Sequence, residues 1–307
     1  MRIVVTGCNG QLALSLVERA KARTNIEVIT VGRPQLDLTR PETVLPALAP
    51  CRPNIVVSAA AYTAVDQAEE EKETAFAVNA VGAGAVAEAA ARLGVPVIHV
   101  STDYVFDGSK EGSYTEADPP APLSVYGASK LAGERAVAAA CPCHLILRIG
   151  WVFSPFGKNF VKTILKLAED HGQISVVADQ RGNPSSGLDV ADALINASLS
   201  LTRSRQSSCF GVYHLAGTGD ASRADLARHV VSVSLAHGGP WAPVRNLATA
   251  EFPARALRPA NSCLSVAKFA AMFGWTMPAW QHSVETVVKR LVLKKQQSEQ
   301  ALPRPLP

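Results

Sequence analysis

The feature that most constrains the fold of this chain is an alternation, along its first half, of short apolar runs and longer alanine-rich stretches. The short runs are rich in Val and Ile and lie at residues 3–5, 28–31, 55–57, 97–100 and 145–148. The stretches 11–22 and 74–93 carry apolar residues at helical spacing. Near-continuous apolar strands that alternate with helices predict an α/β fold, in which helices cover both faces of a doubly wound parallel sheet.

The second half is less regular. Its patterns predict helices at 161–170, 190–199 and 223–235 and strands at 174–177 and 212–215, with prolines at 240, 243, 253, 259 and 278. We interpret this half as a smaller cap that is interleaved with the main sheet. The predicted division is a nucleotide-binding domain at 1–150 to which later segments return, a cap at 151–293 that mainly binds substrate, and a disordered polar, proline-rich tail at 294–307.

Composition narrows the class of protein. Of 307 residues, 48% are hydrophobic and 18% are charged, and 30 Lys and Arg against 26 Asp and Glu give a net charge of +4. This balance indicates a globular protein with no dedicated nucleic-acid surface. The 6 cysteines form no paired CxxC set, so we expect no zinc site and a reducing, cytoplasmic location. We expect neither a secretory signal nor a membrane span.

The first predicted strand runs into a loop at 6–13, Thr-Gly-Cys-Asn-Gly-Gln-Leu-Ala. Gly7 and Gly10 allow a tight turn and a close approach of the backbone to a pyrophosphate, and the following helix offers free N–H groups. Ala13 stands where a third glycine is usual. With a strand before it and a helix after it, the loop predicts a dinucleotide site in a Rossmann-type fold.

The residues after the second predicted strand indicate which dinucleotide binds. NAD-binding folds place an acidic residue there for the ribose 2′-hydroxyl, but this strand ends in Val31-Gly32-Arg33. A guanidinium suits a 2′-phosphate, so we predict NADPH, with NADH as a weaker possibility. The alternative is that Arg33 is a solvated loop charge. Asp37 could hydrogen-bond the adenine amino group.

The most informative set of residues lies between 101 and 130. Ser101, Thr102 and Asp103 follow an apolar strand, and Tyr126 and Lys130 are four residues apart in a predicted helix. Residues at i and i+4 share a helix face, so we expect the ammonium to lower the pKa of the phenol and make it a general acid. Lys130 can also hold the nicotinamide ribose, and Thr102 can hydrogen-bond the same carbonyl oxygen.

These motifs, in this order, resemble those of the extended short-chain dehydrogenase/reductases and, within them, the dTDP-4-dehydrorhamnose reductase family. The resemblance covers about residues 1–290. It rests on the loop at 6–13, on segments 58–69, 101–106, 126–134, 148–153 and 159–160, and on 179–184 and 258–262 in the second half. It implies NADPH-dependent reduction of the C4 ketone of dTDP-4-dehydro-β-L-rhamnose to dTDP-β-L-rhamnose.

The resemblance also assigns roles by position. Tyr126 is then the proton donor, with Lys130 and Thr102 as its partners. The cofactor would be held by Gly7, Gly10, Gln11, Leu12, Arg33, Asp37, Leu38, Ala59, Ala60, Ala61, Tyr62, Thr63, Tyr126 and Lys130. The dTDP-sugar would contact Val65, Thr102, Asp103, Tyr126, Trp151 and Asn159, with Arg181 and Arg258 for its diphosphate.

Some positions depart from the family pattern. Some members place carboxylates in the helix after the glycine loop and bind Mg²⁺ with them at a dimer interface. Here that stretch is Ala13-Leu14-Ser15, and Leu188 occupies a second such place. We therefore expect no metal, and either a monomer or a homodimer.

Two alternatives remain open. The chain could be a non-catalytic regulatory subunit that resembles the β-subunit of methionine adenosyltransferase, although it keeps Thr102, Tyr126 and Lys130 together. It could also act on another nucleotide ketosugar, or be an epimerase or dehydratase of the same superfamily. Asp103 beside Thr102 suits a dehydratase, whereas Gly32-Arg33 favours an exchangeable NADPH.

Overall fold

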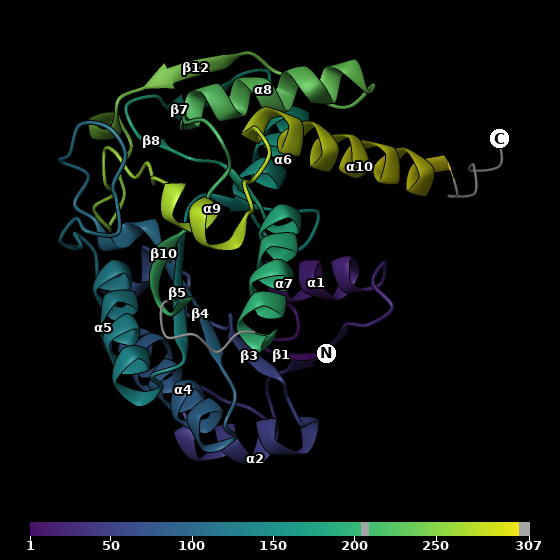
Figure 1. Ribbon diagram of the computed structural model, residues 1–307. Coiled ribbons are helices and arrows are strands. Elements are labelled where there is room, and N and C mark those ends of the chain that lie inside the picture. Colours follow the sequence, from purple (N-terminus) through teal and green to yellow (C-terminus); the bar gives the residue numbers. More distant parts are fainter. Residues whose placement is uncertain (204–208, 301–307) are drawn as a thin grey trace.

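The computed structural model describes residues 1–203 and 209–300 of the chain. Its centre is a six-stranded parallel sheet in the order β10-β5-β4-β3-β1-β2 (Figure 1). The strands are β1 (Arg2–Thr6), β2 (Glu27–Val31), β3 (Ile55–Ser58), β4 (Val97–Thr102), β5 (His144–Ile149) and β10 (Gly211–His214). This sheet confirms the predicted α/β fold. Chain order reverses between β1 and β3, and in open parallel sheets ligands bind at such a point, outside the carboxyl ends of the strands.

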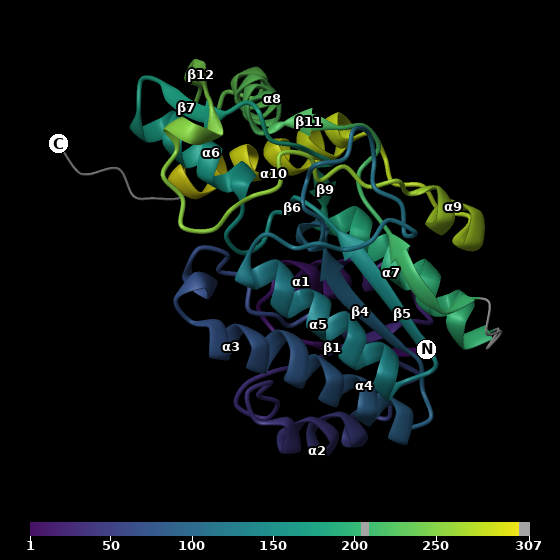
Figure 2. The ribbon, with the colours of Figure 1, turned by 90° about the vertical axis from the view of Figure 1, so that its left-hand side faces the viewer.

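Helices cover both faces of the sheet, because alternate residues of each buried strand point to opposite sides. On one face, Ile3, Val5 and Leu147 pack with α1 (Gln11–Ala20) and α7 (Gly187–Arg203). On the other face, Val4 and Ile146 pack with α2 (Val44–Leu48), α4 (Ala83–Arg92) and α5 (Val125–Ala140). Figure 2 looks onto α4 and α5.

The helix predicted at 74–93 is interrupted in the structure. A short α3 (Lys72–Phe76) passes through a π-helical turn (Ala77–Gly82) into α4. The stretch Lys72–Arg92 is long and apolar enough to cross a membrane by length and hydropathy alone. Its alanines, however, pack against the sheet and α5, as they do in the core helix of a layered α/β fold.

The cap lies above the carboxyl edge of the sheet (Figure 1). Its core is formed by α6 (Phe160–Asp170), α8 (Arg223–Ala236) and the first part of α10 (Trp280–Gln300). Strand β7 (Ile174–Val177) pairs with β12 (Val244–Leu247), β8 (Arg181–Gly182) with β11 (Ala221–Ser222), and β6 (Val152–Phe153) with β9 (Ser185–Ser186). A short α9 (Ala267–Phe273) packs beside β10. Because α7 and β10 belong to the main layers, the chain passes repeatedly between sheet and cap.

The predicted tail differs from the structure. Helix α10 continues to Gln300, so residues 294–300 are helical, and 301–307 lie outside the described residues. The sequence from Leu291 to Gln300 has no proline or glycine that would end the helix. The proline-rich end that suggested disorder begins only at Pro303.

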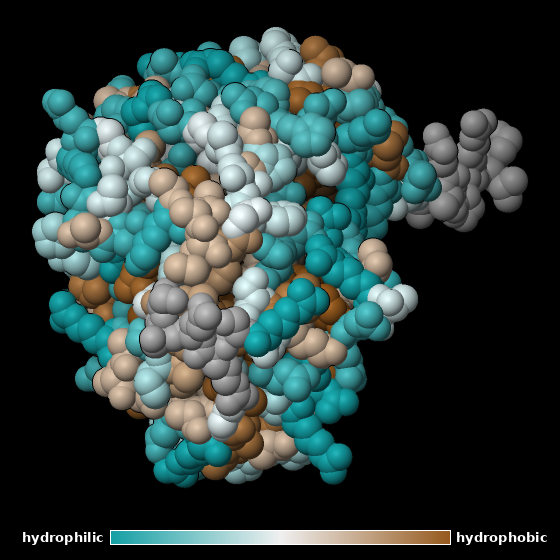
Figure 3. Space-filling view, in the orientation of Figure 1, coloured by the Kyte–Doolittle hydropathy of each residue, from teal (hydrophilic) through white to brown (hydrophobic). Residues whose placement is uncertain are grey.

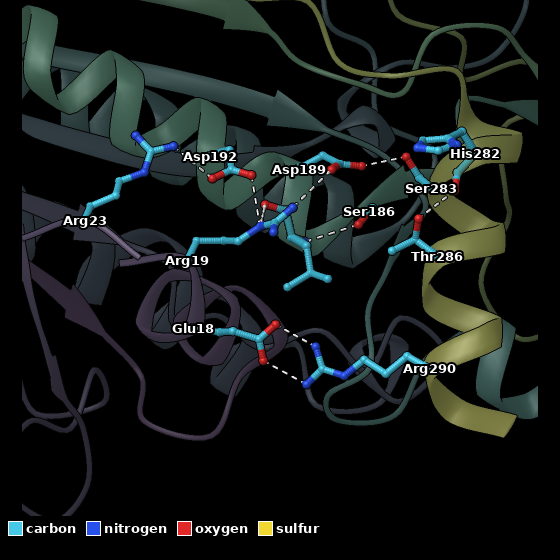
Figure 4. A network of polar contacts seen from close by, with 11 residues as sticks. Glu18, Arg19, Arg23, Ser186, Asp189, Asp192, His282, Ser283, Thr286 and Arg290 are labelled. Carbon is cyan, nitrogen blue, oxygen red and sulfur yellow. Dashed lines mark hydrogen bonds and ion pairs between the residues drawn. The ribbon is translucent and has the colours of Figure 1, made fainter. Parts of the chain in front are cut away.

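A polar network ties the cap to the first helix of the sheet domain (Figure 4). Arg290 on α10 donates to both carboxylate oxygens of Glu18 on α1, at 2.6 and 2.8 Å. Arg19 and Arg23 reach Asp192 on α7, and Asp189 accepts from Ser283 on α10 at 2.6 Å. The contacts of Arg290 and Ser283 hold the cap over α1 and α7, and α1 is the helix that follows the glycine loop.

The surface is mostly hydrophilic on the face shown in Figure 3, where hydrophobic side chains occur in small groups. The large hydrophobic residues that are exposed, such as Trp241 on the cap and Val81 on the π-helical turn, are scattered along the chain. Scattered residues of this kind are normal on soluble domains.

Candidate active site

The glycine loop lies at the point where strand order reverses. Gly7 has φ +94°, a conformation that favours glycine, and its N–H donates to the Val31 carbonyl at 2.7 Å. The hydroxyl of Thr6 accepts from the N–H groups of Ala59 and Ala60, at 3.1 and 3.0 Å, and so joins the ends of β1 and β3.

Helix α1 begins at this loop without a side-chain cap. Gly10 is its N-cap residue, and the space around its Cα is open. The first N–H groups of a helix have no partner within it and carry its positive dipole end. This cradle fits the diphosphate of a dinucleotide, and Gln11 and Leu12 supply the first turn of the helix.

The residues after β2 lie at the far side of this cradle. Gly32 is buried against Cys8, whereas the Arg33 side chain is exposed. The Asp37 carboxylate accepts from the N–H and hydroxyl of Thr39, at 3.0 and 2.7 Å, and these bonds lower its pKa. Leu38 is buried beside Gly82. The exposed guanidinium therefore has room to meet a 2′-phosphate.

The loop after β3 is held by a residue that the sequence analysis missed, Asn79. Asn79 is buried in the π-helical turn, and its Oδ1 accepts from the Tyr62 N–H at 2.8 Å. Its Nδ2 donates to the Tyr62 carbonyl and to the Ser129 hydroxyl, both at 3.0 Å. Asn79 thus joins the loop of Ala61, Tyr62 and Thr63 to helix α5. A π-turn is a structural mark of functional sites, but it gives no clear signal in a sequence.

Helix α5 and strand β4 bring the three predicted catalytic residues to one end of the sheet. Ser124 caps α5 by accepting from the Gly127 N–H at 3.1 Å. A Cβ on Gly127 would lie 2.2 Å from the Tyr104 carbonyl oxygen, so this glycine is required for the close packing. Thr102 is the last residue of β4, and Tyr126 lies in the first turn of α5, one turn before Lys130.

The electrostatics of Tyr126 differ from our expectation. Burial raises the pKa of the Tyr126 phenol, and a hydrogen bond with Thr102 opposes that rise only in part. The predicted lowering by Lys130 is wrong, because Lys130 Nζ donates to the Val100 carbonyl at 2.7 Å and lies 3.3 Å from His99 Nε2. Tyr126 therefore keeps its proton at neutral pH, as a proton donor must.

Lys130 itself is strongly affected by burial. Only 2% of its surface is exposed, and burial lowers its pKa from 10.5 to about 8, with Glu134 opposing the change. Desolvation disfavours the charged form of any buried group. The ammonium is thus held at a cost in free energy, beside the tyrosine that it is expected to assist.

Asp103 is a second buried charge in the site. It is 2% exposed, and its Oδ1 accepts from the Thr102 hydroxyl at 3.1 Å. Burial raises its pKa from 3.8 to about 6, and Ser262, Arg223 and Thr102 partly oppose that rise. This carboxyl group consequently changes its charge near pH 6 and not near pH 4.

Trp151 and Arg223 form the cap side of the site. Trp151 has φ +49°, and its Nε1 donates to the Ser262 hydroxyl at 3.1 Å. The Arg223 guanidinium stacks on the indole, 3.5 Å from the ring centroid, and lies near the Tyr104 phenol. The sequence analysis missed Arg223. The signal lay in its place at the start of α8, between Ser222 and Asp225, which form the capping box of this helix.

The two arginines predicted to bind the substrate diphosphate lie in different surroundings. Arg258 lies near Tyr104 and pairs with Asp66 at 2.6 Å, next to the partly buried Val65. Arg181 instead pairs with Asp220 and is half exposed. The structure thus brings Arg258, and not Arg181, next to Tyr104 and Arg223.

Asn159 has a structural use in the cap. Its Oδ1 caps α6 by accepting from the Lys162 N–H at 3.2 Å. Its Nδ2 donates to Gln11 Oε1 at 3.0 Å, and Gln11 Oε1 also accepts from Ser154 at 2.9 Å. Asn159 thereby couples the cap to the glycine loop.

Within residues 1–203 and 209–300, no group of three or more His, Cys, Asp or Glu side chains is placed to hold a metal ion.

Comparisons with known proteins support the same reading. The family model described as the RmlD substrate binding domain matches residues 1–293. A dTDP-4-dehydrorhamnose reductase from Sinorhizobium fredii is 48% identical over 294 residues, which are 96% of this chain and 99% of the relative. The chain belongs to the dTDP-4-dehydrorhamnose reductase family.

Solved structures of this family share the fold. The dTDP-4-dehydrorhamnose reductase of Clostridium acetobutylicum superposes with a TM-score of 0.86 at 34% identity, over 95% of this chain and 99% of that one. The reductase of Bacillus anthracis, solved in complex with NADP, gives a TM-score of 0.85 at 35% identity, over 93% and 98%.

Proposed function

We propose that this chain reduces the C4 ketone of dTDP-4-dehydro-β-L-rhamnose to dTDP-β-L-rhamnose with NADPH, in the cytoplasm. The observation that carries the proposal is the placement of Thr102, Tyr126 and Lys130 at one end of the sheet, between the glycine loop and Trp151. The names of the relatives at up to 48% identity supply the substrate. A regulatory subunit without chemistry would have no use for the three groups together.

The glycine loop and its neighbours hold the cofactor. Gly7, Gly10, Gln11 and Leu12 receive the diphosphate at the start of α1, and Arg33 receives the 2′-phosphate. Asp37 and Leu38 lie at the adenine side, and residues 59–63 follow β3 along the cofactor. When bound, NADPH supplies a hydride to the carbonyl carbon of the sugar.

Tyr126 supplies the proton. Its phenol O–H donates to the carbonyl oxygen, and the proton passes to that oxygen as the hydride makes it negative, which leaves a phenolate. The Thr102 hydroxyl donates a second hydrogen bond to the same oxygen. The Lys130 ammonium holds the nicotinamide ribose beside the phenol, and the phenolate regains its proton from solvent.

The cap side binds the charged part of the substrate. Arg223 and Arg258 both lie near the Tyr104 phenol, so two guanidinium groups are close together at this point of the site. Guanidinium forks suit diphosphate oxygens. Trp151 offers an apolar face to the sugar, and Asp103 offers a hydrogen-bond partner to a sugar hydroxyl.

The test is NADPH oxidation with dTDP-4-dehydrorhamnose, followed by absorbance, with product identification. We expect turnover by the wild type, and a loss of at least about a hundredfold in Tyr126→Phe with NADPH binding retained. Tyr114→Phe is the matched control, since that phenol is buried against Phe106 and bonds Asp107 at 2.8 Å. A wild type that binds NADPH but oxidises neither it nor NADH would overturn the substrate assignment.

A further inference from the structure

Behind Lys130, on the side away from the cap, lies a buried imidazole that the reaction as described does not use. His99 is on β4, is 1% exposed, and places Nε2 3.3 Å from Lys130 Nζ. Its other ring nitrogen, Nδ1, lies 3.2 Å from the hydroxyl of Ser58 at the end of β3. The three side chains form a buried row from β3 through β4 to α5.

The chemistry of these groups fixes their roles. An ammonium has three donors and no acceptor, so Nε2 must accept from Lys130. Burial and the charge of Lys130 keep the pKa of His99 well below its usual value, so the ring is neutral and carries its one N–H on Nδ1. That N–H donates to Ser58 Oγ, which holds the ring in the orientation that serves Lys130.

The packing of α5 prevents the ring from moving away. Gly133, one turn after Lys130, approaches so closely that a Cβ there would lie 2.0 Å from the Asn79 carbonyl oxygen and 3.6 Å from His99 Nε2. His99 and the Val100 carbonyl therefore take two of the three Lys130 N–H groups. The third is left for the open end of the site.

We infer that His99, held by Ser58, is a positioning residue for Lys130 that aims one N–H of its ammonium at the cofactor ribose and the Tyr126 side of the site. The inference rests on the proposed function for the reaction, but the hydrogen bonding and charge of Lys130 can be tested apart from the identity of the sugar.

The other ionisable groups around this row do not substitute for His99. Glu134, one turn further along α5, is bound to Arg148 at 2.7 Å and to Ser101 at 2.5 Å. Tyr126 is neutral, and Asp103, after the end of β4, bonds Thr102. Removal of the imidazole therefore leaves the buried ammonium with the Val100 carbonyl as its remaining hydrogen-bond acceptor in this row.

The test compares His99→Leu, which has no acceptor, with His99→Gln, which keeps one, in the full chain. We expect His99→Leu to lower kcat about tenfold or more at neutral pH, to leave the KM for the sugar nucleotide unchanged, and to move the alkaline limb of the pH profile to lower pH. His99→Gln should recover most of kcat and return the limb toward its wild-type position. A purely structural role would lower the thermal midpoint without moving the pH profile.

Ser58→Ala provides the independent arm, because it removes a hydroxyl and leaves the imidazole in place. We expect it to shift the profile in the same direction by a smaller amount. NADPH affinity, measured by fluorescence titration without sugar, should weaken in His99→Leu, so the inference can be tested even if dTDP-4-dehydrorhamnose is not the substrate. The inference would be overturned if Ser58→Ala and a folded His99→Leu both kept the wild-type pH profile and the wild-type NADPH affinity. If His99→Leu does not fold, the Ser58→Ala result alone decides.

Discussion

Two sets of buried charges lie within a few residues of each other on α5 and the strands beneath it, and they behave differently. Glu134 and Arg148 are about 4% exposed, and the carboxylate receives the guanidinium through two hydrogen bonds of 2.9 and 2.7 Å. Lys130, one turn earlier on α5, has no carboxylate within salt-bridge distance in the described residues, and Asp103 likewise has no such basic partner.

The difference distinguishes a charge pair that supports the fold from unpaired charges that serve the reaction. A buried charge with a partner and satisfied hydrogen bonds can be held at little net cost, whereas an unpaired one costs free energy and shifts its pKa. Glu134 and Arg148 join α5 to β5 and so fix the helix that carries Tyr126. We propose that Lys130 and Asp103 remain unpaired because a neutralising partner would occupy the place of cofactor or substrate.

Breaking the paired set should have the largest effect on stability. Glu134→Gln leaves a buried guanidinium without a counter-charge, which costs about 3–5 kcal/mol of unfolding free energy. Denaturant unfolding measures this directly. The matched control replaces both partners, Glu134→Leu with Arg148→Met, and should recover much of the loss; a single variant as stable as the wild type would contradict the account.

Removing an unpaired charge should instead raise the free energy of unfolding. Because the pKa of Asp103 is raised from 3.8 to about 6 in the fold, its burial cost is absent below pH 3.8 and complete above pH 6. Asp103→Asn should therefore stabilise the protein at pH 7.5 by on the order of 2 kcal/mol, with a smaller gain at pH 4.5. Thermal unfolding at the two pH values checks the sign, and reduced turnover should accompany the gain. A variant that is less stable at pH 7.5 than at pH 4.5, relative to the wild type, would refute this.

On the cap side of the site, we expect replacement of Arg223 to have a smaller effect than the two changes above. Arg223→Gln should raise the KM for the sugar nucleotide about tenfold, or about 1.4 kcal/mol, and leave NADPH affinity unchanged. Arg228→Gln, in the same helix, is the control because that side chain is 44% exposed and contacts Asp225. Equal effects of the two variants would show that the position, and not a contact with substrate, is responsible.

The sheet and the proximity of the candidate catalytic residues could be predicted because local sequence determines them. Buried strands read as Val- and Ile-rich runs, and a glycine loop after the first of them predicts a cofactor site without knowledge of the rest. Tyr126 and Lys130 are one helical turn apart, so their proximity also follows from local structure.

The remaining features depend on contacts between distant segments. The pKa of Tyr126 could not be predicted from its spacing to Lys130, because His99 and the Val100 carbonyl bind the ammonium from β4. Arg223 stacks on Trp151 from 72 residues further along the chain. Long-range contacts of this kind leave no periodic signal in the sequence.

The most direct test of the account is Lys130→Met, measured for stability and turnover together. The folded state lowers the pKa of Lys130 from 10.5 to about 8, so its burial cost is complete below pH 8 and fades as pH rises toward 10.5. We predict that Lys130→Met is more stable than the wild type at pH 7, by on the order of 3 kcal/mol, and has lost NADPH-dependent turnover. A variant that is less stable at pH 7, or that still turns over at the wild-type rate, would contradict the claim that this unpaired charge is kept for chemistry.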